Sequence, residues 1–157
     1  QEYNAHLADG TAETGGYKDK LEDAIWCNDR RFTSGPLLSK DTGGTDYSYF
    51  GADSRNSTSP YSPSFTCVKN DAFTQNESAV GNGALDNPVG LLTADEYTLA
   101  GSGWNGYSSS AYLNTGQMQW SLSPYSFDNY YASGFYLSDS SELSGDLVDY
   151  ASGARPA

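Results

Sequence analysis

The sequence has few residues of several types, and each shortage excludes a class of protein. No run of about eighteen apolar residues occurs, so no direct insertion into a membrane is predicted. Lys and Arg total 8 against 20 Asp and Glu, and the net charge of −12 excludes nucleic acid as a main partner. The chain has no G-x-S-x-G, no H-E-x-x-H and no phosphate-cradling glycine loop. We therefore predict a protein that is not an enzyme and has neither a cofactor nor a metal site.

The two cysteines, Cys27 and Cys67, are too few for a four-ligand zinc site, and no C-x-x-C motif is present. A disulfide between them would close a loop of about forty residues, worth on the order of 4 kcal/mol. The alternative is two buried thiols in a reducing compartment. We favour the disulfide and, with it, an exported protein that is extracellular or at a cell surface.

The length of 157 residues predicts one compact domain over 1–157. Apolar residues make up 37% of the chain, and Gly, Ser, Asn and Asp are plentiful, which favours a loop-rich domain. Residues 1–16 read as an N-terminal arm, with an edge strand near 2–7. The only histidine, His6, lies there with no neighbour to orient it as a catalytic base. The chain opens without a basic, apolar leader, so we expect a mature or trimmed protein.

Two helices are predicted. Over 17–27, apolar residues from Tyr17 to Ile25 form one stripe, and Cys27 is expected at the helix end. Thr93 and Glu96 have the capping-box spacing that begins a second helix. Capping explains the acidic pair Asp95–Glu96 better than a metal site does.

Alternating and apolar stretches predict short strands at 47–50 and 89–92. They also predict three or four antiparallel strands after residue 101, of which three are placed near 118–122, 134–138 and 145–150. Pro124 is expected to end the first of these three, because proline cannot sustain a central hydrogen-bond ladder. The run Asn28-Asp29-Arg30-Arg31 is expected to be a turn with capping side chains. An ion-pair node and a ligand contact are the other interpretations.

The segment 101–157 holds seven of the thirteen Tyr and two of the three Trp, without a single Lys. Its Tyr, Ser, Gly and Asn are typical of antibody paratopes, where Tyr gives rigid contact area and the small polar residues give adaptable hydrogen bonds. We therefore predict a ligand-binding face made by Trp104, Asn105, Tyr107, Ser108, Ser109, Ser110, Met118, Gln119, Tyr125, Asp128, Asn129, Tyr130 and Tyr131.

Four motifs occur in order along the chain: Val89-Gly-Leu-Leu-Thr-Ala-Asp-Glu, Tyr112-Leu-Asn-Thr-Gly-Gln, Trp120-Ser-Leu-Ser-Pro and Gly153-Ala-Arg-Pro, with Trp26-Cys-Asn-Asp-Arg upstream. Together they resemble motifs of bacterial surface and pilin-like proteins of gut Firmicutes. The resemblance implies a C-type-lectin-like fold of the formylglycine-generating-enzyme branch, with short antiparallel sheets, two helices and long loops. Variable proteins of diversity-generating retroelements share that branch. The calcium signatures of sugar-binding C-type lectins are absent from the sequence.

The family resemblance suggests what the chain does. It implies a non-enzymatic, adhesin-like domain that binds a protein or glycan at a cell surface, with the clusters at 105–110 and 128–131 as output of retroelement diversification. Ordinary Ser/Tyr-rich loops of a relative that is not diversified explain those clusters equally well. The alternative function is a structural minor pilin or surface-assembly subunit that contacts other pilus subunits. An enzyme on the same fold ranks third, because its active-site cysteines would have to be free.

Overall fold

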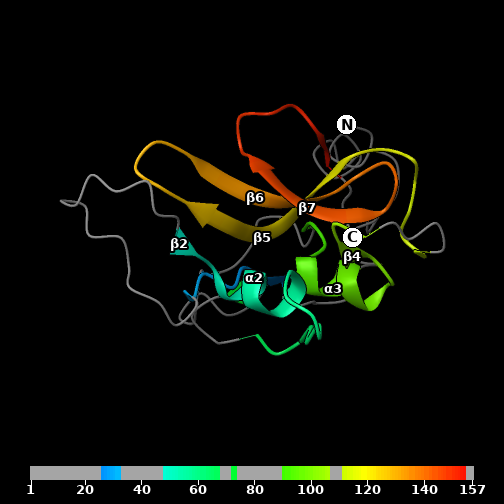
Figure 1. Ribbon diagram of the computed structural model, residues 1–157, viewed down its shortest axis with the longest axis horizontal. Helices are drawn as coiled ribbons and strands as arrows, with labels where there is room; N and C mark the ends of the chain where they lie inside the picture. Colours follow the sequence, from blue (N-terminus) through cyan, green and yellow to red (C-terminus); the bar gives the residue numbers. More distant parts are fainter. Residues whose placement is uncertain (1–25, 33–47, 68–71, 74–89, 107–110, 155–157) are drawn as a thin grey trace, which may run out of the picture.

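The computed structural model describes residues 26–32, 48–67, 72–73, 90–106 and 111–154. In these parts the protein is mixed α+β, with a curled six-stranded sheet and two short helices beneath it (Figure 1). The predicted α+β class is thereby confirmed. The arm at 1–16, with His6 and the strand expected near 2–7, lies outside the described residues.

Three antiparallel strands form the centre of the sheet. They are β5 (Gln119–Phe127), β6 (Ala132–Leu137) and β7 (Glu142–Leu147). These strands overlap all three that the sequence predicts, although β6 and β7 begin two to three residues earlier than expected.

Short strands complete the sheet on both sides. β2 (Ser48–Tyr49) pairs with the end of β5, and β8 (Gly153–Ala154) pairs with its start. β4 (Gly103–Trp104) runs parallel to the start of β7. A separate two-stranded sheet joins β1 (Trp26–Cys27) to β3 (Ala72–Phe73).

The core lies between the sheet and the helices α2 (Gly51–Asn56) and α3 (Ala94–Leu99). Fully buried side chains come from both layers, namely Ala52, Ala94, Tyr97, Phe135, Leu137 and Leu143. Aromatic rings fill the space next to them: Tyr125 lies 5.0 Å from Phe135 and 5.1 Å from Trp104 between ring centroids. Edge and tilted packing of this kind favours aromatic pairs.

Gly145 shows how closely this core is packed. It lies opposite Phe135 on the inner face of the sheet, and a Cβ there would come within 2.7 Å of Cε1 of Tyr125. Only glycine leaves room for the tyrosine ring. The neighbouring pair, Gly134 and Asp146, faces the opposite, outer side of the sheet, because successive residues of a strand alternate between faces.

The cysteines are joined as predicted. Cys27 and Cys67 form a disulfide with Cα atoms 5.6 Å apart, and no free cysteine occurs among the described residues. The bridge attaches β1 to the segment that follows α2. Within the described residues, no helix has the length and apolar character needed to cross a membrane.

Three sequence predictions need correction. Trp26 and Cys27 lie in strand β1 and not at a helix end, while 17–25 of the predicted helix lie outside the described residues. Proline does not end β5: the strand continues through Pro124 to Phe127, and its register against β6 shifts on both sides of the proline. The missing N–H therefore falls at an irregularity, where a ladder tolerates it.

The third correction concerns the stretch at 89–92. Val89 is outside the described residues, and residues 90–92 contain a single β-bridge residue, Leu91, and no strand, although Leu92 accepts a hydrogen bond from the amide of Leu122 at 2.8 Å. Helix α2, which the sequence did not predict, follows β2 directly. No side chain caps its first residue, so the local sequence carries little signal for it.

Candidate functional site

The turn between β5 and β6 presents two adjacent tyrosines. Tyr130 and Tyr131 are 82% and 55% exposed, and their ring centroids lie 6.3 Å apart. Asp128 holds the turn: its Oδ1 accepts the amides of Tyr130 and Tyr131 at 2.7 and 2.6 Å, and its own amide donates to the carbonyl of Tyr131 at 2.9 Å. An aspartate that bonds backbone amides two and three residues ahead fixes a turn. The backbone that carries the two rings is therefore organised without a ligand.

Two more exposed apolar side chains lie at the same end of the sheet. The amide of Val148 donates to the carbonyl of Ala132 at 3.0 Å, which places the residue after β7 beside the start of β6. Val148 and Tyr150 are 60% and 59% exposed. We call the set Tyr130, Tyr131, Val148 and Tyr150 the hairpin-end surface: the first two lie on the β5–β6 turn, and the other two follow β7, which the bond from Val148 to Ala132 holds beside the start of β6.

A groove of about 440 Å³ adjoins the hairpin-end surface and shares Val148 with it. Its walls are mostly apolar and come from β5, β6 and the start of α2, including Phe50, Trp120, Leu122, Pro124, Phe127 and Ala132. Gly134 lines the groove as well, and a Cβ there would lie 3.4 Å from Trp120 and 3.9 Å from Val148. The groove thus opens on the outer face of the sheet, away from the core.

The other residues predicted to bind ligand are not gathered at this surface. Gln119 is 4% exposed, and Tyr125 and Trp104 pack against the core. Burial raises the pKa of Tyr125, and the charge of Asp53 adds to the effect. These three side chains are placed to stabilise the fold, because their rings and amide face other protein groups.

Asn105 and Met118 are exposed but lie at the opposite end of the sheet. Asn105 follows β4, next to the start of β7, in a left-handed conformation with φ of 47°. Its amide, oriented to satisfy both neighbours, accepts from Trp104 Nε1 at 2.9 Å and donates to Glu142 Oε1 at 3.2 Å. Six residues of β7, roughly 20 Å, separate this end from the hairpin-end surface.

The described residues therefore place Asp128, Asn129, Tyr130 and Tyr131 together and set the other predicted residues apart. Tyr107, Ser108, Ser109 and Ser110 lie outside the described residues. Sequence reasoning missed Val148 and Tyr150, which it assigned to a strand. A signal for them is present in the sequence. The strand pattern stops at Leu147, but the apolar residues Val148 and Tyr150 follow directly after it.

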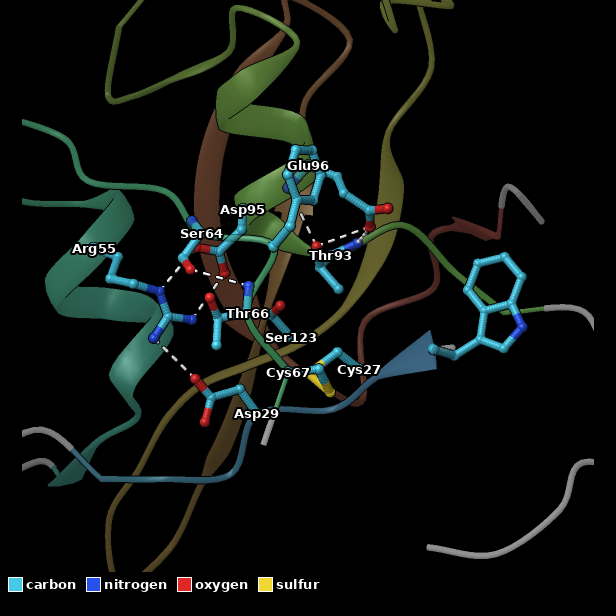
Figure 2. Close-up of a pocket in the computed structure, with 12 residues that line it drawn as sticks. Cys27, Asp29, Arg55, Ser64, Thr66, Cys67, Thr93, Asp95, Glu96 and Ser123 are labelled. Atoms are coloured by element: carbon cyan, nitrogen blue, oxygen red, sulfur yellow. Dashed lines mark hydrogen bonds and ion pairs between the residues drawn. A yellow bond between two sulfur atoms is a disulfide. The ribbon is translucent and has the colours of Figure 1, made fainter. Parts of the chain in front are cut away.

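A second hollow, of about 400 Å³, lies between the disulfide and α3 and contains an ion-pair node (Figure 2). Arg55 reaches from α2 to two carboxylates. Its Nε and Nη2 donate to the two oxygens of Asp95 at 2.8 and 2.9 Å, and its Nη1 donates to Asp29 at 2.8 Å. Arg31 donates to both oxygens of Asp29 from the other side. Asp95 also accepts the amide of Ser64 at 2.9 Å.

The charged groups of the node change one another's pKa values. Burial alone would raise the pKa of Asp29, but hydrogen bonds from Arg31 and Arg55 and the charge of Arg55 outweigh it and lower the pKa to about 2. The hydrogen bonds that Arg55 donates to Asp95 raise the pKa of Arg55 above its ordinary value despite its burial. Every guanidinium nitrogen of Arg55 donates to a carboxylate, so the node is a structural joint between α2, α3 and the segment that follows β1. Of the interpretations considered for Asn28–Arg31, the ion-pair node is found at Asp29 and Arg31, and Asp29 Oδ1 also accepts the amide of Arg31 at 3.1 Å, a capping contact of the kind that the favoured turn interpretation expects.

The rest of the hollow is lined by Trp26, Phe65, the disulfide and polar side chains, and several of the polar groups are used by the fold. Thr93 Oγ1 accepts the amide of Glu96, and Glu96 Oε2 accepts the amide of Thr93 at 2.7 Å, which is the predicted capping box. Ser123 Oγ accepts the amide of Ala94 at 3.0 Å. Among the residues that the structure describes, no group of three or more His, Cys, Asp or Glu side chains could hold a metal ion.

Comparisons of the chain with protein-family models, with curated protein sequences and with solved structures found no match. The resemblance to C-type-lectin-like variable proteins therefore stays a prediction.

Proposed function

We propose that this protein is a non-enzymatic, adhesin-like binding domain of an exported bacterial surface or pilus protein, and that it binds its ligand with the hairpin-end surface. The observation that carries the proposal is the pair of exposed tyrosines, Tyr130 and Tyr131, on a turn held by Asp128. Buried rings would need no explanation beyond the core, whereas adjacent exposed rings on an ordered turn are typical of binding sites.

Preorganisation of the turn lowers the entropic cost of binding at this surface. Ordering a flexible side chain on binding costs about 0.5–1.5 kcal/mol, and a turn that is already hydrogen-bonded lowers that cost. Val148 and the adjoining groove add apolar area that a ligand group can fill. The disulfide supports an oxidising, extracellular location for such a domain.

A binding screen with matched variants tests the proposal. The protein is immobilised and probed with a glycan array and with a phage library of random peptides. Every hit is then measured against Tyr130→Ala/Tyr131→Ala and against the control Tyr112→Ala, which removes an 88% exposed tyrosine elsewhere. We expect the double variant to weaken binding at least about tenfold, the loss of 1.4 kcal/mol or more, and the control to leave it unchanged.

Two results would contradict the proposal. One is hits that bind the double variant and the parent protein equally. The other is a screen in which neither glycans nor peptides bind. Concentration-dependent self-association in sedimentation experiments, lost in Tyr130→Ala/Tyr131→Ala, would instead support the alternative of a structural pilus or assembly subunit.

We further propose that the fold is C-type-lectin-like and that retroelement diversification produced the tyrosine turn. The mixed α+β architecture and the exposed turn at 128–131 support the proposal. Sequencing the 3′ end of the gene across a population tests it, together with a search for a near-identical template repeat. Adenine-confined substitutions at the codons of Asn129 and Tyr130 are expected. A uniform 3′ end without a template would remove the claim and leave the binding proposal standing.

A further inference from the structure

We propose that the partner of the hairpin-end surface is a cationic protein segment, rich in Arg and Lys and carrying a large apolar residue. This inference rests on the proposed binding function and names the class of ligand. Three features carry it: the sign of the charge around the surface, the way its carboxylates are fixed, and the aromatic faces and groove between them.

The segment that forms the surface has acidic side chains only. From 101 to 154 the chain has five of them, Asp128, Asp139, Glu142, Asp146 and Asp149, and no basic one, and Asp128, Asp146 and Asp149 are those near the hairpin end. Arg30 and Arg31 flank the other side of the groove, between Asn28, which lines it, and Phe32, which packs against Phe127. The ion pairs of the described residues all belong to the node of Arg31 and Arg55 with Asp29 and Asp95, and none involves these five acids. Their negative charge is therefore open to neutralisation by a partner.

Two of these carboxylates are held in place by the backbone. Asp128 Oδ1 accepts the amides of the tyrosine turn, and Asp146 Oδ1 accepts the amide of Leu147 at 2.8 Å. In both groups the second oxygen, Oδ2, has no hydrogen bond within the described chain. A fixed carboxylate with a free oxygen loses little entropy when it accepts a guanidinium or ammonium donor.

Asp146 lies on the same face as the groove. It is the register partner of Gly134, and directly opposite residues of paired strands point to the same side of a sheet. Gly134 in turn approaches Trp120 and Val148, which line the groove. Asp149, which is exposed, follows Val148. The acidic groups thus border an apolar hollow, the arrangement of a protein interface with an anchor pocket and a polar rim.

The tyrosine faces favour the same class of ligand. A guanidinium or ammonium within about 6 Å of an exposed aromatic ring gains roughly 0.5–1 kcal/mol. Tyr130 and Tyr131 offer two such rings next to Asp128. A neutral glycan could stack on the rings and donate hydroxyl hydrogen bonds to the carboxylates, but it would leave their charge unneutralised, and polyanions would be repelled. A cationic segment uses both features.

The test uses synthetic fluorescent peptides and the full chain. One probe has four Arg or Lys residues around a central Trp or Leu pair, and its partner has Gln at each basic position. Fluorescence anisotropy gives Kd for the parent protein, for Tyr130→Ala/Tyr131→Ala and for Asp146→Asn/Asp149→Asn. The control Asp139→Asn/Glu142→Gln removes the same charge away from the hairpin end. Asparagine keeps the amide-accepting oxygen of Asp146, so the fold is expected to persist, and circular dichroism checks it.

We expect the cationic probe to bind at least about tenfold more tightly than its Gln counterpart. Both the tyrosine and the Asp146/Asp149 variants should weaken it at least fivefold, and the control should change it less than twofold. Affinity should fall as NaCl rises from 50 to 300 mM.

Other outcomes overturn the inference in distinguishable ways. If the acidic control weakens binding as much as Asp146→Asn/Asp149→Asn, or if the tyrosine variant has no effect, the attraction is only that of a −12 chain. If the cationic probe fails while a glycan or neutral peptide binds in a Tyr130/Tyr131-dependent way, the cationic partner is wrong and the binding function stands. If nothing binds through these tyrosines, both proposals fall.

Discussion

At the scale of single residues, Arg55 is the side chain that joins three separate parts of the fold through ion pairs. It is the cation between two carboxylates, Asp29 and Asp95, whose side chains are only 8% and 6% exposed. The run Asn28–Arg31 made an ion pair conceivable from the sequence, but nothing there identified Arg55, twenty-six residues further on, as the partner. Only the packing of α2 against α3 brings the three groups together.

Removing Arg55 should therefore destabilise the protein strongly. Arg55→Ala leaves the buried carboxylate of Asp95 without its cationic partner and removes one of the two cations that contact Asp29, and such a loss costs about 3–5 kcal/mol. Urea denaturation followed by tryptophan fluorescence would measure it. The matched change Arg31→Ala removes a half-exposed partner of the same node and should cost less than about 1 kcal/mol. Equal losses for the two variants would show that Arg55 has no special role.

The lowered pKa of Asp29 predicts how stability depends on pH. The folded value of about 2 lies below the ordinary value of 3.8, so the ionised group stabilises the fold above pH 4. That contribution, on the order of 2 kcal/mol, is lost as the pH falls from about 4 through 2. Asp29→Asn should flatten the stability profile in this window. Parallel profiles for parent and variant between pH 2 and 4 would contradict the assignment.

At the scale of elements, α3 was predictable and α2 was not. Thr93 and Glu96 form a capping box that is legible in the sequence, because both partners lie three residues apart. Helix α2 has no side-chain cap, and Arg55 attaches it to residues distant in the chain. Similarly, the alternating pattern located β5 to β7, but the register shifts that accommodate Pro124 depend on β6.

The capping box offers the second stability test. In a helix of six residues, Thr93→Ala removes the acceptor for the Glu96 amide and should cost about 1 kcal/mol. Thr98→Ala is the matched control, because Thr98 Oγ1 only bonds back to the carbonyl of Ala94. We expect a change within about 0.5 kcal/mol for the control, since alanine is the better helix former. Thermal unfolding by circular dichroism distinguishes the two, and a larger loss for Thr98→Ala would refute the interpretation.

At the scale of the whole molecule, the disulfide compensates for a small core. Cys27→Ser/Cys67→Ser opens a loop whose ends are 40 residues apart and should lower the free energy of unfolding by about 4 kcal/mol. Reduction of the parent protein with dithiothreitol should have the same effect, and denaturation with and without reductant measures it. A variant as stable as the parent would mean that other contacts already fix this segment.

The candidate site was predictable only in part, because the exposure of each aromatic side chain depends on the fold of the whole molecule. The paratope-like composition singled out the segment after 101 and, within it, the tyrosine turn at 128–131. It could not separate exposed aromatic residues from buried ones. Tyr125 and Tyr131 have the same chemistry, yet one packs against Phe135 and the other faces solvent.

The sequence alone determined the properties that depend on counting or on near neighbours: the acidic charge, the cysteine pair, the capping box and the strand periodicity. These need only a few adjacent residues or a sum over the chain. The tertiary structure decided which side chains meet across long separations. It brought Val148 beside the turn at 128–131, joined Arg55 to Asp29 and Asp95, and set Asn105 at the far end of the sheet. Strand register and the packing of the helices on the sheet determine these contacts, and no local sequence pattern predicts them.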